Sequence, residues 1–89
     1  MDSFTIKTRS HTDFINIDRF VADAVRETGF EDGVVTVFIP HTTAGVTINE
    51  NADPDVLADM EMVLDRMVPW KGGYSHSEGN TAAHVKASM

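Results

Sequence analysis

The stretch GVVTVFIP, residues 33–40, constrains the fold of this chain more than any other segment. Its side chains alternate between two faces, at positions 34, 36 and 38 and at 35, 37 and 39, and both faces are largely apolar and β-branched. A strand of this kind is typical of the centre of a sheet that is covered on both sides. Pro40 ends the strand because it has no backbone N–H to donate. The chain is therefore expected to fold around a sheet.

Three other segments are expected to contribute strands to that sheet. Residues 4–8, FTIKT, alternate apolar and polar side chains, which predicts a strand with one solvated face. Residues 14–17 predict a second short strand paired with the first, and residues 45–50, GVTINE, predict a strand after a turn at residues 41–45. The result is a two-layer domain of sheet and helices, although the number of strands is low for such a domain.

Two helices are indicated by the residues at their ends and by apolar stripes. Asp18 is expected to cap a helix over residues 19–28, and Gly29 is expected to stop it. Asp53 is expected to cap a stronger helix that has Pro54 at its first position, where the missing N–H costs least. One continuous apolar face on this second helix comprises Val56, Leu57, Met60, Val63, Leu64 and Met67.

A last helix is expected over residues 81–89, with Asn80 as its cap. It continues to Met89 without a residue that would cap its C-terminus. Either this segment is a frayed tail, or the chain is a partial domain over residues 1–89 whose remaining strands are missing. The low number of strands favours the partial domain.

The composition excludes several classes of function. The 14 acidic and 7 basic residues give a net charge of −7, which would repel the phosphates of a nucleic acid. Without cysteine there is neither a disulfide nor a thiolate, so any metal would be held by His, Asp, Glu or water. No secretory leader opens the sequence, and the longest apolar run is too short to cross a membrane, which predicts a cytoplasmic protein.

The first candidate site is the turn His41-Thr42-Thr43-Ala44-Gly45. Its small residues would let the backbone approach a ligand, and its hydroxyls and amides suit the oxygens of a phosphate. The alternative is an ordinary turn in which Thr42 or Thr43 bonds to its own backbone. A second candidate lies just past the expected strand end, at Asn49 and Glu50, where binding residues are often found.

The third candidate is YSHSEGNTAAHVKA, residues 74–87. In one continuous helix His76 and His84 would be ~12 Å apart along the axis, too far to share an ion. A bend at Gly79 would bring the two imidazoles together and leave Glu78 to accept a hydrogen bond or act as general base. The alternative is an exposed histidine in a loop and a helical histidine packed on the core. With His41, the two histidines would suit zinc or a similar divalent metal with one open position.

The stretches HTTAGVTINENADPDV and YSHSEGNTAAHVKA together resemble the YjbQ-type family, which is named for a secondary thiamine-phosphate synthase activity. The resemblance covers nearly the whole chain. It implies an α+β fold, a two-layer sandwich in which a largely antiparallel sheet packs against helices. It also implies a homotrimer with ligand sites near subunit boundaries. The family's polar pocket falls here on His41, Thr42, Thr43, Asn49, Glu50, His76, Glu78, Asn80 and His84.

This sequence departs from the family because it stops at AHVKASM, whereas relatives continue with further strands, a Gly-Thr-Trp-Gln-Gly-like segment and an Asp-Gly-Pro-Arg-like ending. Those strands would complete the sheet, so the fold is expected to be incomplete at the C-terminus.

The resemblance implies an enzyme that joins a pyrimidine methyl diphosphate to a thiazole phosphate and releases diphosphate. His41, His76 and His84 would hold the metal, while Thr42, Thr43, Gly79 and Asn80 would bind phosphate. Glu50, Glu78 and Asn49 are the expected catalytic residues, with a glutamate handling protons. The alternatives are a module that binds a metal or a phosphorylated metabolite without turnover, and a structural oligomer whose histidines are incidental.

Overall fold

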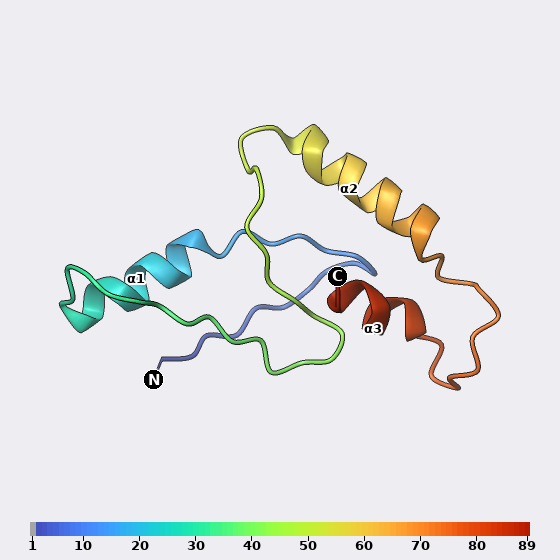
Figure 1. Cartoon of the computed structure of the whole chain (residues 1–89), viewed down its shortest axis with the longest axis horizontal. Coiled ribbons are helices and arrows are strands. Elements are labelled where there is room, and N and C mark those ends of the chain that lie inside the picture. Colours follow the sequence, from blue (N-terminus) through green and yellow to red (C-terminus); the bar gives the residue numbers. More distant parts are fainter. Residues whose placement is uncertain (1) are drawn as a thin grey trace. The chain divides into compact units, whose positions relative to one another are not determined.

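Three helices are the only regular elements of residues 2–89, the part of the chain that this computed structural model describes (Figure 1). They are separated by long irregular segments. Their bounds are Asp18–Thr28 for α1, Pro54–Met67 for α2 and Thr81–Ala87 for α3.

The chain divides into two units, one ending at Val37 and the other running from Phe38 to Met89. The first unit contains α1, and the second contains α2 and α3. All candidate site residues belong to the second unit.

The expected sheet is not present in residues 2–89, so the prediction of a two-layer α+β sandwich is wrong for this chain. The segments 4–8, 14–17, 33–40 and 45–50 contain no strand. Between residues 2 and 89, the backbone hydrogen bonds outside the helices join residues only three or four positions apart. A strand needs a neighbouring strand to pair with its N–H and C=O groups. Alternation of side chains decides which of them share a face, but it does not supply that neighbour.

The stretch at residues 33–40 differs most from its prediction. Val34 is 95% exposed and Phe38 is 77% exposed, so neither of its faces is covered. The side-chain pattern of this segment suits a central strand, but residues 2–89 form no sheet in which it could lie.

Helix α1 begins one residue earlier than predicted and is not capped by Asp18. The side-chain oxygen of Asn16 accepts a hydrogen bond from the Asp18 N–H at 2.8 Å, and Ile17 holds the N-cap position. Gly29 ends the helix as predicted, with a left-handed φ of 76° that glycine adopts without strain. In the same unit Phe4 stacks on Phe20, with ring centroids 4.7 Å apart.

Helix α2 confirms the prediction made from its end residues. The Asp53 carboxylate accepts a hydrogen bond from the Asp55 N–H at 2.9 Å, and Pro54 occupies the first turn. No side chain of the helix is fully buried, and its apolar face is an open groove of about 400 Å³. The groove is lined by Val56, Asp59, Met60, Val63 and Leu64.

Helix α3 is shorter than predicted, ending at Ala87. It carries Ala82, which is 0% exposed and is, with Val68, one of two buried hydrophobic residues in the described part of the chain. No helix formed by residues 2–89 has both the length and the apolar character needed to cross a membrane.

Candidate functional site

The chain turns sharply between His76 and α3. Gly79 has a φ of 75°, in the left-handed region that favours glycine, and its N–H donates to the His76 carbonyl at 3.3 Å. This reversal brings the ring of His76 to the ring of His84, which projects from the last turn of α3. The ring centroids are 5.6 Å apart and the planes meet at 81°, an edge-to-face contact.

Glu78 lies within the same turn and faces His76. Its Oε2 is 3.9 Å from His76 Nε2, and its side chain is 73% exposed. At that distance and exposure the pair adds little to stability. The carboxylate is therefore available for water or a ligand beside the imidazole.

Asn80 holds the N-cap position of α3 but does not cap the helix with its side chain, which corrects the sequence-based prediction. Its carbonyl accepts hydrogen bonds from the N–H groups of Ala83 and His84, at 3.0 and 3.3 Å. Its side-chain oxygen Oδ1 is buried and has no hydrogen-bond partner within the described residues. A buried acceptor without a donor is costly, so the side chain of Asn80 does not stabilise the start of α3.

The turn at residues 41–45 approaches α3 rather than an open cavity. A Cβ added to Gly45 would lie 2.8 Å from the carbonyl oxygen of Ala87, so this small residue makes room for the backbone of α3. Thr42 and Thr43 form the turn itself and are exposed. Their hydroxyl groups remain accessible to a phosphate.

Three further predicted site residues belong to the segment that precedes α2. His41 and Glu50 are exposed, and Asn49 uses its side-chain oxygen to accept the Glu50 N–H at 2.7 Å. Across residues 2–89, no three side chains of His, Cys, Asp or Glu come together in an arrangement that could hold a metal ion. The structure thus joins His76, Glu78 and His84, and does not bring His41 to them.

The separation of the two rings is compatible with a shared metal. Two imidazoles that bind a tetrahedral zinc at about 2.0–2.1 Å have ring centroids about 5 Å apart, close to the observed 5.6 Å. The separation alone permits two imidazoles on one zinc, and no third His, Cys, Asp or Glu side chain of residues 2–89 joins them to complete a metal site.

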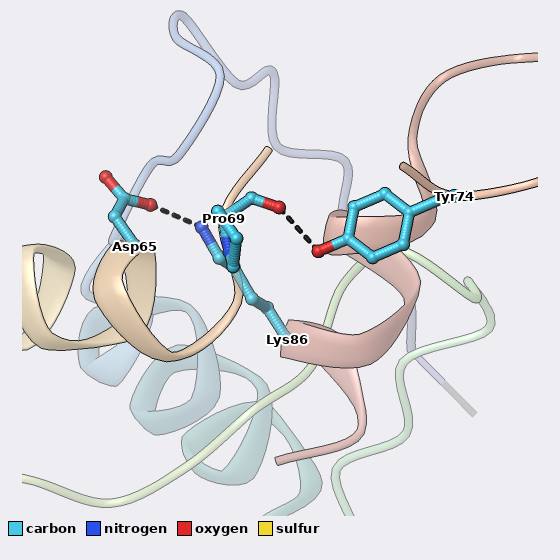
Figure 2. A network of polar contacts seen from close by, with 4 residues as sticks. All are labelled: Asp65, Pro69, Tyr74 and Lys86. Carbon is cyan, nitrogen blue, oxygen red and sulfur yellow. Dashed lines mark hydrogen bonds and ion pairs between the residues drawn. The ribbon is translucent and has the colours of Figure 1, made fainter. Parts of the chain in front are cut away.

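Sequence reasoning missed the residue that holds α3 in place. Lys86 forms an ion pair with Asp65 in the last turns of α2 (Figure 2). Its ammonium group also lies 4.6 Å from the centroid of the Trp70 ring. Close by, the Tyr74 hydroxyl donates to the Pro69 carbonyl at 2.6 Å. The sequence carries no signal for this contact, because Asp65 lies 21 positions before Lys86 and only the fold makes them neighbours.

Comparison with known proteins gives the class to which this histidine-bearing chain belongs. The family model described as "UPF0047 protein YjbQ-like" matches residues 2–89. The chain is 47% identical to YugU of Bacillus subtilis over 89 residues, and 40% identical to a UPF0047 protein of Methanocaldococcus jannaschii over 86 residues. The chain belongs to the YjbQ-like UPF0047 family.

A solved structure agrees with this assignment. The chain superposes with a TM-score of 0.91 and 54% identity on the crystal structure of an uncharacterised YjbQ/UPF0047 protein from Clostridium acetobutylicum, over 93% of this chain and 64% of that chain. The matches cover 99% and 97% of this chain but 67% and 62% of the bacillar and archaeal relatives. The chain thus spans about two thirds of the length of these relatives.

Proposed function

We propose that this chain is part of a YjbQ-type enzyme with thiamine-phosphate synthase activity. In the reaction, the nitrogen of a thiazole phosphate forms a bond to the methylene carbon of a pyrimidine methyl diphosphate. The carbon–oxygen bond breaks, and diphosphate leaves with the electron pair. The observation that supports the proposal is the His76–His84 ring pair beside Glu78 in a chain of this family.

The roles of the residues follow from the charge that develops on the leaving diphosphate. Donors already in position stabilise such charge because they need no rearrangement during the reaction. The imidazoles of His76 and His84, the hydroxyls of Thr42 and Thr43 and the backbone amide of Asn80 would supply these donors, while Gly79 forms the turn that presents them. The proton-handling roles fall to Glu78 or Glu50, with Asn49 beside Glu50 to orient substrate.

A divalent metal, zinc being the first choice, would add Lewis-acid stabilisation of the diphosphate oxygens. Its proposed ligands are His76, His84 and, after a rearrangement that brings it closer, His41. A homotrimer with this site near a subunit boundary is part of the same proposal.

A second candidate is a module that binds a metal or a phosphorylated metabolite without turnover. It is favoured by the finding that only two imidazoles lie together within residues 2–89, with no third side chain placed to complete a metal site. A third candidate, a structural oligomer, would leave the histidine pair without a role.

The test is an assay for thiamine phosphate and diphosphate with the two precursors, run with and without zinc. The wild-type chain should form both products, and His76→Ala and His84→Ala should each lower the rate by at least about 100-fold. His11→Ala, in the other unit, is the matched control. One zinc per chain that disappears in both site variants, with no product formed, would reject the enzyme in favour of the binding module. Zinc binding that survives both variants would reject the site itself.

A further inference from the structure

The orientation of α3 cannot come from the helix alone. A helix of seven residues is far below the length at which an isolated helix is stable in water. Its N-cap side chain adds no hydrogen bond to hold its start. The direction in which His84 points is therefore decided by the contacts that α3 makes with its surroundings.

Helix α3 has one face that is buried and another that carries His84. Ala82 and Lys86 are four residues apart and share one face, whereas Asn80 and His84 share another. Residues two apart, such as His84 and Lys86, lie about 200° apart around the axis. Ala82 is 0% exposed and the Lys86 side chain 9% exposed, so this face is the one that packs. Lys86 and His84 therefore project from nearly opposite sides of α3, and fixing Lys86 also fixes the side from which His84 projects.

Lys86 is fixed by two partners at the end of α2. Its ammonium group pairs with the Asp65 carboxylate and lies 4.6 Å from the centre of the Trp70 ring. Figure 2 shows this ion pair next to the hydrogen bond from Tyr74 to Pro69, which closes the connector that leaves α2. The same connector leads to His76, and α3 carries His84. Both histidines therefore lie on segments that are attached to the C-terminal end of α2.

We propose that Lys86 is the positioning residue of the His76–His84 pair. It acts through the rotation of α3 about its own axis and does not itself touch a ligand. This inference rests on the proposed function only in assigning metal binding to the pair. The ring contact itself can be observed without a metal.

Three substitutions separate the charge of Lys86 from its packing. Lys86→Met keeps an unbranched apolar stem over Trp70 and removes the charge. Lys86→Arg keeps the positive charge, a donor for the Asp65 carboxylate and a cation that can lie over the Trp70 ring. Asp65→Asn weakens the ion pair from the other side. Val85→Ala, an exposed position on the same helix, is the matched control.

Two measurements follow each variant, with far-UV circular dichroism to show that the helices persist. The first is a titration with zinc alone in competition with a coloured chelator. The second is the NMR shift of the ring protons of His76 and His84, which sense each other's ring current at the present spacing. We expect Lys86→Met to weaken zinc binding by about 10-fold or more and to move the ring signals toward those of free histidine. Lys86→Arg should restore both readouts, and Val85→Ala should change neither.

The outcomes separate this inference from the proposed function. Unchanged ring signals and zinc affinity in a folded Lys86→Met would overturn the positioning role and leave the site intact. A wild-type chain that binds no zinc, but whose ring signals respond to Lys86→Met and recover in Lys86→Arg, would support positioning and reject the metal. If Lys86→Met unfolds, the other two variants test the positioning role. Ring signals that stay at their wild-type positions in Asp65→Asn would overturn the proposal.

Discussion

Helices α2 and α3 lie in the same unit but form for different reasons. Helix α2 carries its own start, because Asp53 caps it and Pro54 occupies its first turn, and its apolar face stays open to solvent. Helix α3 has half its length and no side-chain cap, yet it carries the fully buried Ala82. The formation of α2 is therefore determined by its own sequence, whereas the formation of α3 depends on the residues that pack around it.

This difference matters for the candidate site, since His84 lies on the helix that depends on its neighbours. Damage to a contact of α3 is expected to reach the histidine pair. Damage to the start of α2 is expected to change helix content and to leave the two rings where they are.

The strongest way to break this comparison is Gly45→Ala. The added methyl group would meet the Ala87 carbonyl at 2.8 Å, and a backbone atom cannot move aside cheaply. We expect a loss of about 1–3 kcal/mol in the free energy of unfolding, together with loss of the His76–His84 ring contact. Urea unfolding followed by circular dichroism and the ring-proton NMR shifts measure the two effects. Ala44→Ser, at the adjacent exposed position, is the control; equal stability of the two variants would contradict the close approach.

A smaller effect is expected from Asp53→Ala. Loss of the capping hydrogen bond to the Asp55 N–H should lower the free energy of unfolding by about 1 kcal/mol and reduce helix content. The ring contact of the histidines should persist. Asp59→Ala removes the same charge from the same helix without touching the cap, so a similar loss in both variants would show that charge, rather than capping, is responsible.

The smallest effect on the free energy of unfolding is expected at Asn80, the N-cap position of α3. Asn80→Ala removes no capping bond and relieves a buried oxygen that has no partner. The free energy of unfolding should therefore stay within about 0.5 kcal/mol of wild type or rise. Urea unfolding of the ligand-free chain gives the answer. A loss as large as that of Asp53→Ala would mean that Asn80 caps α3 in solution after all.

The local parts of the fold could be read from the sequence. The Asp53-Pro54 start of α2 and the Gly29 stop of α1 are set by chemistry within one helical turn, and both predictions are confirmed. The sheet could not be predicted in this way, because a pattern such as that of residues 33–40 specifies a face and not a partner. The prediction that Asp18 caps α1 was wrong for a local reason. The side-chain oxygen of Asn16, two residues earlier, accepts the hydrogen bond from the Asp18 N–H, and Asp18 lies inside the helix.

In the candidate site, too, the features set by neighbouring residues could be predicted and those set by distant residues could not. The reversal at Gly79 was foreseeable because glycine adopts a positive φ without strain, and the meeting of His76 and His84 follows from it. The anchoring of Lys86 was not foreseeable, since Asp65 and Trp70 are distant in the sequence and become neighbours only when α3 packs. The roles assigned to His41, Asn49 and Glu50 remain predictions.

Ile48 is 99% exposed, in a stretch where the backbone has no ladder to join. An exposed β-branched side chain in an unpaired segment is a template for another strand, and other copies of the chain are the nearest source in a concentrated solution. Self-association should therefore limit how far this molecule can be concentrated, and a charge placed at this position would be the simplest remedy.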